Sequence, residues 1–348
     1  MPDPQSILNI LSGRSRGLGP TVVRTAARGV EPFYSGAMRV RNALFNTGIK
    51  HSHPLARPVV SVGNLTTGGT GKTPIVQWLC EQLIARGHHP AVLLRGYRSA
   101  GGISDEAELY RQNKRIEVEP DPDRVRAAAR VLARSPDTSV FVLDDGFQHR
   151  RVKRDLDIVL VDASNPFGFG HVLPRGLLRE PIAGIARAHV IVITRATDDV
   201  KPLVTRLRKL NALAPIYICR HRITGLLDTQ DASTRLNVNE RVLAFAGVGN
   251  PESFAERLRA DLMLTNVTLD ASISDHHPYS IVDLNRIVSL GAFDAWVTTE
   301  KDFVKIRRLE SIPITRLLRA QLRIDFADGH ADELMGLIMD RIDVRKTV

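Results

Sequence analysis

A short segment rich in glycine and threonine could bind a nucleotide. It reads LTTGGTGKTP over residues 65–74 and contains Gly71, Lys72 and Thr73 in succession. Backbone N–H groups of such a loop surround phosphate oxygens, the lysine contacts the terminal phosphates, and the threonine hydroxyl binds Mg2+. The standard pattern has a glycine five residues before Gly71, where this chain has Thr66. The segment therefore predicts a variant phosphate-binding loop, with a purely structural turn as the alternative. The predicted nucleotide-binding residues are Thr66, Thr67, Gly68, Gly69, Thr70, Gly71, Lys72 and Thr73.

Two adjacent acids at the end of an apolar segment are candidates for a metal site. The segment SVFVLDDGFQH covers residues 139–149, and Asp144 and Asp145 directly follow its apolar residues. In open α/β sheets ligands gather at the carboxyl ends of strands, and adjacent carboxylates repel each other unless a cation lies between them. We therefore predict that Asp144, Asp145 and Thr73 bind Mg2+. An Asp-Asp-Gly turn without a metal is the alternative, and Asp162, after the next apolar segment, is a second candidate anchor.

Apolar segments alternate with helical patterns along the first two thirds of the chain. Strands that are apolar throughout and separated by helices indicate a parallel sheet with helices on both faces. The glycine-rich loop then lies between a strand and a helix, which is the context that a nucleotide-binding loop requires. Strands are predicted over 58–64, 90–97, 139–145, 157–163 and 189–195, and helices over 74–87 and 120–134, the latter with Asp121 as N-cap.

The alternation changes near residue 220. A polar stretch follows, and new strands are predicted over 241–250, 295–302 and 322–326. A chain of 348 residues is also long for a single hydrophobic core. We therefore predict an α/β fold with a P-loop NTPase-like, mostly parallel sheet, helices on both faces, and a smaller second α/β domain. The predicted P-loop domain covers 1–220, and the second domain, which would close the active-site cleft, covers 221–348.

The net charge of +10 favours anionic partners such as nucleic acid, acidic lipid or a phosphorylated substrate. Much of this charge is local, because the first sixty residues contain eight basic and only two acidic side chains. Phe33, Ala37, Val40 and Leu44 recur there at helical spacing, so residues 25–50 predict a basic amphipathic helix that rests on a membrane surface or packs on its own domain. No apolar run could span a bilayer, no secretory signal is recognisable, and the two cysteines indicate a reducing, cytosolic compartment.

Several segments, taken in order along the chain, resemble one enzyme family. The loop SVGNLTTGGTGKTP (61–74) and the acid pair in LDDGFQHR (143–150) are together similar to those of tetraacyldisaccharide 4'-kinase, the kinase family of the lipid A pathway. The family's loop commonly begins with Asn-Leu followed by Ser or Thr, which agrees with Thr66. The resemblance extends from about residue 25 to 326. Its further segments are LLRGYR (93–98), NPFGFGHVLPRGLLREP (165–181), AFAGVGNPESF (244–254), DHHPY (275–279) and TTEKDFVK (298–305).

This resemblance implies an activity and a location. The family transfers phosphate from ATP, with Mg2+, to the 4'-hydroxyl of a tetraacylated glucosamine disaccharide 1-phosphate, which gives lipid IVA. Its basic, apolar N-terminal segment meets the cytoplasmic face of the inner membrane, so the resemblance implies a cytoplasmic protein that is peripheral on that membrane. We expect a monomer whose partners are the acylated substrate and the membrane surface, and we expect no nucleic-acid partner.

The resemblance also assigns roles to individual residues. Lys72 would hold phosphate, Asp105 in the segment SDEA would be the base that activates the sugar hydroxyl, and His276 in DHHPY would assist it. The family's segment is Gly-Asp-Glu-Pro, so this chain departs from it on both sides of the acidic pair, and a helix N-cap is the alternative for Asp105. Arg179 would neutralise charge on the transferred phosphate, or form a structural salt bridge. The residues expected to orient the loop or the substrate are Asn64, Gln148 and His149.

Two other classes of function are compatible with parts of the sequence. A basic P-loop ATPase that acts on nucleic acid would hydrolyse ATP faster with DNA or RNA and would bind in a salt-sensitive way. An aromatic content of 5% and the lack of a recognisable reader motif argue against this class. A non-catalytic scaffold at a membrane surface would bind Mg-ATP without turnover.

Overall fold

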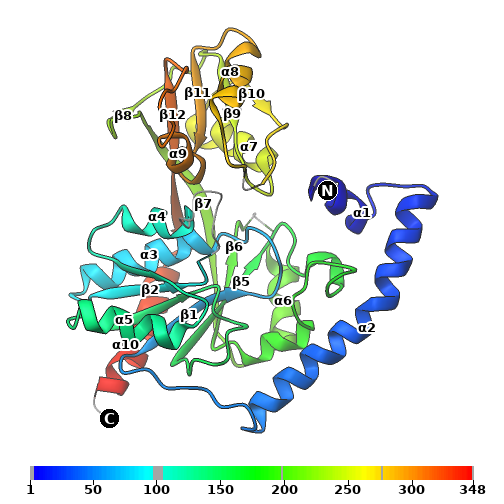
Figure 1. Ribbon diagram of the computed structural model, residues 1–348, viewed down its shortest axis with the longest axis vertical. Coiled ribbons are helices and arrows are strands. Elements are labelled where there is room, and N and C mark those ends of the chain that lie inside the picture. Colours follow the sequence, from blue (N-terminus) through cyan, green and yellow to red (C-terminus); the bar gives the residue numbers. More distant parts are fainter. Residues whose placement is uncertain (1–3, 97–104, 197–198, 276, 347–348) are drawn as a thin grey trace. The chain divides into compact units, whose positions relative to one another are not determined.

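The computed structural model describes the chain except for residues 1–3, 97–104, 197–198, 276 and 347–348. The chain forms two compact units (Figure 1). The first unit contains Met1–Gly96, Asn113–Arg220 and Asp325–Val348, and the second contains Tyr97–Gln112 and His221–Ile324. The long strands β7 (Ile216–Leu227) and β12 (Leu317–Phe326) carry the chain from one unit into the other.

The first unit is built on a parallel sheet. Its strands are β1 (Val59–Asn64), β2 (Pro90–Leu94), β3 (Glu117–Pro120), β4 (Val140–Asp144), β5 (Leu156–Asp162), β6 (Val190–Thr194) and the start of β7. The strand order is β7-β6-β5-β1-β4-β2-β3, and each pair of neighbours is parallel. All residues of β1, β2, β4, β5 and β6 are buried, which explains why these segments are apolar throughout. Because the chain places β2, β3 and β4 on one side of β1 and β5, β6 and β7 on the other, the carboxyl end of β1 is the expected place for a ligand.

Helices of the first unit pack on this sheet. α3 contacts β1, β2 and β4, and α5 contacts β2 and β3. The first helices of the chain, α1 and the long α2, and the last helix, α10, also belong to this unit (Figure 1). The helices are α1 (Pro4–Ser12), α2 (Leu18–Asn46), α3 (Lys72–Ala85), α5 (Arg124–Arg134), α6 (Lys201–Leu210) and α10 (His330–Lys346), with the 3-10 helices η1 (Gly168–Gly170) and η2 (Ile182–Arg187).

The second unit has a smaller parallel sheet in the order β10-β9-β11-β12. Alternate residues of its strands enter two different cores: Val242 and Ala244 pack in one, and Leu243 and Phe245 in the other, so both faces of the sheet are covered. The remaining elements are β8 (Ser233–Thr234), β9 (Val242–Phe245), β10 (Val267–Asp270), β11 (Ala295–Thr299), α4 (Asp105–Arg111), α7 (Pro251–Leu262), α8 (Ile281–Ser289) and α9 (Glu300–Ile306).

The predicted domain bounds of 1–220 and 221–348 differ from this division in two places. Residues Asp325–Val348 belong to the first unit, because α10 contacts it: Ile218 N donates to His330 Nδ1 at 3.0 Å, and Arg345 contacts Asp155. Residues Tyr97–Gln112 belong to the second unit, because α4 packs against α9. The order of residues alone does not show that a segment packs in a different unit from its neighbours in the sequence.

Several predicted element boundaries were also wrong. The strands predicted over 90–97 and 241–250 end at Leu94 and Phe245, and the strand predicted over 322–326 begins at Leu317. Helix α5 begins at Arg124 and is capped by Asp123, whose side chain accepts from Val125 N and Arg126 N, whereas Asp121 accepts from the Arg126 side chain. The strand predicted over 295–302 ends at Thr299, because the Thr299 hydroxyl accepts from Asp302 N and caps α9.

Candidate active site

The glycine-rich loop connects β1 to α3, as predicted. Gly68 and Gly71 have φ angles of 104° and 80°, which glycine adopts far more readily than other residues. Gly71 caps α3, so Lys72 and Thr73 lie in the first turn, where backbone N–H groups lack helical partners. A Cβ atom added at Gly68 or Gly69 would meet no atom within 4 Å, so the loop borders open space. This geometry suits an anion.

Thr66 has a structural place in the loop. It forms an antiparallel bridge with Leu178, and on either side Thr67 N donates to Leu177 O and Arg179 N donates to Leu65 O, both at 2.7 Å. A residue in such an extended pairing does not need the conformational freedom of glycine. The bridge also fixes the segment that carries Arg179 beside the entrance of the loop.

Lys72 and Arg179 converge on one carboxylate. Arg179 Nη1 lies 2.6 Å from Asp145 Oδ2, and Lys72 Nζ lies 3.6 Å from Asp145 Oδ1. Lys72 Nζ also donates to Asn64 Oδ1 at 3.3 Å. Burial raises the pKa of the Asp145 carboxyl, but the positive charges of Lys72 and Arg179 outweigh this effect and hold the pKa below its ordinary value. Asp145 is therefore ionised at neutral pH, and two cations meet next to the loop.

Asp144 and Thr73 present hard oxygen ligands at the same edge of the sheet. Asp144 is the last residue of β4, is buried, and stands beside Val62 in the register with β1, two residues before Asn64. Thr73 is in the first turn of α3. Within the described residues no cluster of three or more His, Cys, Asp or Glu could hold a metal ion by itself. This donor set suits Mg2+, which takes one or two protein carboxylates and completes its shell with phosphate and water.

Glu180 is a buried acceptor that joins three segments. It is 0% exposed and accepts from Asn42 Nδ2 at 2.8 Å, from Gln148 Nε2 at 3.0 Å and from Arg187 Nη2 at 2.9 Å. Gln148 Nε2 also donates to Asn64 O at 2.9 Å. Gln148 therefore links the segment after the acid pair to the end of β1, and Glu180 links both to α2.

The parts played by Asn42 and Arg187 in this network were not predicted. Asn42 lies 138 residues from Glu180 in the chain, and Arg187 lies 7 residues from it. No local spacing in the sequence indicates the contact between Asn42 and Glu180. A usable signal was the glutamate itself, since a glutamate next to Arg179 in an otherwise apolar segment must find partners if it is buried.

Helix α2 is anchored at the site yet exposes apolar residues. Tyr34 Oη donates to Arg179 O at 2.8 Å, and Arg41 Nη2 donates to Gln148 O at 2.6 Å. Both alternatives for the basic helix thus have support, because it contacts its own unit but none of its residues is buried. Among the described residues, no helix is long and apolar enough to cross a membrane. The large exposed apolar residues of α2 are Leu18, Val22, Val23, Val30, Phe33 and Val40.

His149 carries a neutral ring at physiological pH. Burial, together with the positive charges of Arg124 and Arg154, lowers the pKa of the His149 imidazole to about 4. Its backbone N–H donates to Gly146 O at 2.8 Å, within the turn that follows the acid pair. The expected role of His149 in orienting the loop or the substrate stays a prediction.

The two residues expected to activate the sugar belong to the second unit. Asp105 is the first residue of α4, which packs against α9. Its side chain and the whole of His276 lie outside the described part of the structure, so their roles stay predictions. The segments that flank position 276 are described, and α9 contacts both of them.

Asp162, the second candidate for a metal anchor, is engaged in structural contacts. It is buried, its carboxylate forms an ion pair with Arg195, and it accepts from Ser164 Oγ at 2.7 Å. Asp145 is likewise engaged by Lys72 and Arg179, so the choice of the acid pair Asp144 and Asp145 as the anchor stays a prediction.

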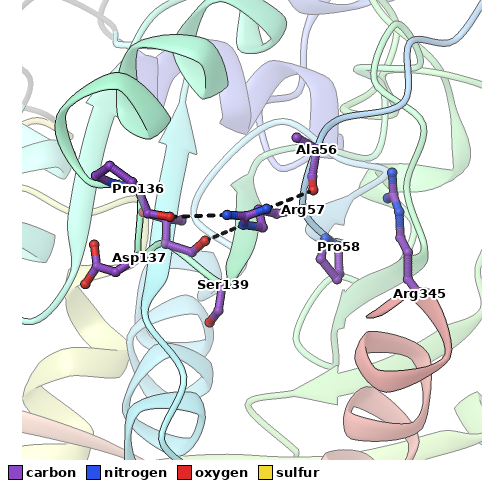
Figure 2. Close-up of a pocket in the computed structure, with 8 residues that line it drawn as sticks. Ala56, Arg57, Pro58, Pro136, Asp137, Ser139 and Arg345 are labelled. Atoms are coloured by element: carbon purple, nitrogen blue, oxygen red, sulfur yellow. Dashed lines mark hydrogen bonds between the residues drawn. The ribbon is translucent and has the colours of Figure 1, made fainter. Parts of the chain in front are cut away.

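A pocket of about 470 Å3 lies at the opposite end of the sheet (Figure 2). Pro58 and Ser139, which directly precede β1 and β4, line it, so it borders the amino ends of these strands. Arg57 and Arg345 also line it, but Arg57 donates to Thr138 O at 2.7 Å, and Arg345 contacts Asp155. Because both guanidinium groups have protein acceptors, the pocket gives no argument for an anionic ligand.

Comparisons with known proteins identify the family. The family model described as Tetraacyldisaccharide-1-P 4'-kinase (LpxK) matches residues 26–342. Two proteins named tetraacyldisaccharide 4'-kinase are similar: that of Chlorobaculum tepidum is 35% identical over 78% of this chain and 84% of its own, and that of Geobacter metallireducens is 36% identical over 78% and 86%.

A crystal structure supports the fold. LpxK from Aquifex aeolicus, solved in complex with ATP, superposes with a TM-score of 0.72 at 24% identity and covers 92% of this chain and 99% of its own. The predicted α/β fold, with a P-loop NTPase-like sheet, is thereby confirmed. From the family match over most of its length and from these relatives, we conclude that this chain belongs to the tetraacyldisaccharide-1-P 4'-kinase family.

Proposed function

We propose that this chain transfers the γ-phosphate of ATP to the 4'-hydroxyl of a tetraacyldisaccharide 1-phosphate, which gives lipid IVA. The observation that carries the proposal is the convergence of Lys72 and Arg179 on Asp145, next to the glycine-rich loop at the carboxyl end of β1 and β4. Two cations beside backbone N–H groups suit the phosphates of a nucleotide. The family to which the chain belongs supports the lipid acceptor.

Lys72 and Arg179 would act on the phosphates. Phosphate oxygens compete with Asp145 for both cations, and the backbone of Gly68, Gly69 and Gly71 would surround the β-phosphate. In the transition state the equatorial oxygens of the transferred group are negatively charged, so a lysine and an arginine held in place lower the barrier by electrostatic stabilisation. Before the nucleotide binds, Asp145 holds the two side chains next to the loop.

The residues also fit Mg2+. Asp144 and Thr73 would hold Mg2+ together with phosphate oxygens. Once Lys72 and Arg179 contact the phosphates instead of Asp145, Asp145 would also be able to bind the metal. When bound, Mg2+ neutralises charge on the β- and γ-phosphates.

The acceptor sugar would be activated by residues of the second unit. Asp105 would accept the proton of the 4'-hydroxyl, with His276 assisting, while the hydroxyl oxygen forms a bond to the γ-phosphorus and ADP leaves. Correct placement of the hydroxyl oxygen contributes as much to the rate as removal of its proton, because the loose transition state has little bonding to the nucleophile. Asn64, Gln148 and His149 would orient the substrate or the loop.

Helix α2 would place the enzyme at the cytoplasmic face of the inner membrane. Its exposed residues Phe33 and Val40 can enter the lipid, and its arginines can contact anionic head groups. The acyl chains of the substrate would then remain in the membrane while the sugar reaches the site. The enzyme would act as a monomer, without a nucleic-acid partner.

The test is transfer of labelled γ-phosphate from ATP to tetraacyldisaccharide 1-phosphate in detergent micelles. We expect labelled lipid IVA with Mg2+ present and its loss with excess chelator. Folded protein that transfers no label would contradict the proposal. ATP hydrolysis that is stimulated by DNA or RNA but not by lipid would instead support a nucleic-acid ATPase.

A further inference from the structure

A buried carboxylate in the second unit fastens two loops to helix α9. Asp302 is 0% exposed, and its Oδ2 accepts from Gly247 N at 2.9 Å and from Thr299 Oγ1 at 2.7 Å. Gly247 follows β9, and Thr299 ends β11. Asp302 Oδ1 lies 3.9 Å from Lys305 Nζ, one turn further along α9. An internal carboxylate with these partners fixes the backbone of both segments.

The same helix holds both neighbours of position 276. Lys305, which is 6% exposed, donates from Nζ to His277 O at 2.9 Å. Lys301 Nζ lies 3.7 Å from Asp275 Oδ1. The segment before and the segment after residue 276 are therefore each attached to α9 by a lysine.

Close packing adds to these contacts. A Cβ atom at Gly247 would lie 2.9 Å from Asp302 Oδ1, 3.1 Å from Ser274 O and 3.3 Å from His277 N. A side chain at this position would therefore crowd Asp302, Ser274 and His277. Because Gly247 has no side chain, the loop after β9 can approach Ser274, His277 and Asp302 of α9 closely.

Helix α9 also contacts α4, the helix that begins with Asp105. α4, whose first residue is Asp105, packs against α9, and Arg307 Nη2 donates to Glu108 Oε1 at 3.3 Å. One short helix thus touches both α4 and the segments around position 276.

We propose that Asp302 and Lys305 are positioning residues for phosphoryl transfer: as a buried pair on α9, with Lys301, they hold the 274–279 segment so that His276 and Asp105 address the same sugar hydroxyl. This inference rests on the proposed function of those two residues. A displacement of about 1 Å in a catalytic group can lower the rate about 100-fold, so the rigidity of the residues that support it has catalytic consequences. Because the nucleotide loop belongs to the first unit and the pair to the second, the inference predicts an effect on kcat and an unchanged KM for ATP.

The experiment compares variants at the pair with a matched control. Asp302→Asn replaces one oxygen of the buried carboxyl group with an amide nitrogen, Lys305→Met removes the bond to His277 O, and Lys305→Arg keeps a donor there. Leu258→Ala is the control, because Leu258 is equally buried in the second unit but packs in the other core. We expect Asp302→Asn and Lys305→Met to lower kcat about 10- to 100-fold with an unchanged KM for ATP, and Lys305→Arg to retain most of the activity. Leu258→Ala should lower Tm but not kcat.

A double variant tests whether the pair acts through His276. If it does, Asp302→Asn in a His276→Ala background lowers kcat no further, whereas independent structural damage gives additive losses. Additive losses, or an Asp302→Asn enzyme with the kcat of the parent, would overturn the inference.

Amide hydrogen exchange gives a readout that does not need activity. We expect faster exchange across 274–279 in Asp302→Asn and in Lys305→Met, and unchanged exchange there in Leu258→Ala. If the parent enzyme transfers no phosphate, the proposed function fails, while the exchange result still decides whether the pair holds the segment. Unchanged exchange in both pair variants would contradict that role.

Discussion

The Arg179 guanidinium and the Asp145 carboxylate are 2.6 Å apart, although 34 residues separate them in the chain. Asp145 follows β4, and Arg179 is brought to it by the pairing of residues 177–179 with the entrance of the glycine-rich loop. Lys72 approaches the other oxygen of the same carboxylate. The contact thus unites three segments into one site for phosphate.

Removal of the Arg179 side chain should slow transfer without unfolding the enzyme. Arg179→Ala is expected to lower kcat about 100- to 1,000-fold, because a charge held at the transferred group is lost. The contact of Tyr34 with the Arg179 carbonyl is retained and Asp145 keeps Lys72 as a partner, so the protein should stay folded. Steady-state kinetics measure the effect. Arg175→Ala is the control: Arg175 lies in the same loop but donates to Leu11 O, and its loss should leave kcat within about twofold. Equal losses in both variants would remove Arg179 from the mechanism.

Glu180 is expected to be a major determinant of stability. Glu180→Ala leaves Arg187 without its buried partner, and it also removes the acceptor of Asn42 and Gln148. Loss of one member of a buried ion pair costs about 3–5 kcal/mol of the free energy of unfolding. Denaturant unfolding measures this change. Glu117→Ala, which breaks an exposed pair with Arg134, should cost at most about 1 kcal/mol. A small effect at Glu180 would show that the network is not cooperative.

The exposed apolar residues of α2 should drive membrane binding. Phe33 is 79% and Val40 is 60% exposed, and burial of such a side chain in lipid contributes about 1.5–3 kcal/mol. Phe33→Asp and Val40→Asp are each expected to weaken binding to vesicles with anionic lipid about tenfold or more, as measured by cosedimentation. Leu213→Asp changes a residue that is 95% exposed elsewhere in the first unit and should have no effect. Unchanged binding of all three variants would argue against the membrane role of α2.

His149 should make the stability of the folded protein depend on pH. Its folded-state pKa is about 4 against an ordinary value of 6.5, so the unfolded chain takes up a proton more readily than the folded chain. The contribution of the neutral ring is therefore complete above pH 6.5 and declines as the pH falls from about 6.5 to 4. We expect the loss of Tm over this range to be smaller in His149→Gln than in the parent. NMR titration of the ring should give a midpoint near 4, and a midpoint near 6.5 would refute the assignment.

Local features of the sequence were enough for the central part of the fold. Uniformly apolar strands separated by helices predict the parallel sheet, since a strand that is covered on both faces has no polar side. Gly68, Gly71 and Lys72 predict the phosphate loop, since their spacing follows from local backbone geometry. These predictions depend only on residues that are close together in the sequence, so they can be made without the structure.

Helix boundaries were less accessible. Asp121 was predicted as the cap of α5, but Asp123 caps the helix, because the side chains of Arg126 and Arg130 engage Asp121 in the folded structure. The competing partners come from the next turns of the helix, so a cap assigned by residue type alone is uncertain.

By itself, then, the sequence determined the sheet, the loop, the acid pair and the family that these motifs resemble. Only the tertiary structure decided that Arg179 reaches Asp145, that Glu180 joins α2 to the site, and that α9 holds both sides of position 276. The tertiary structure also decided that residues 325–348 belong to the first unit. The physical reason is the same in each case. These contacts join segments far apart in the chain, and burial of charged and polar groups selects partners that no local spacing encodes.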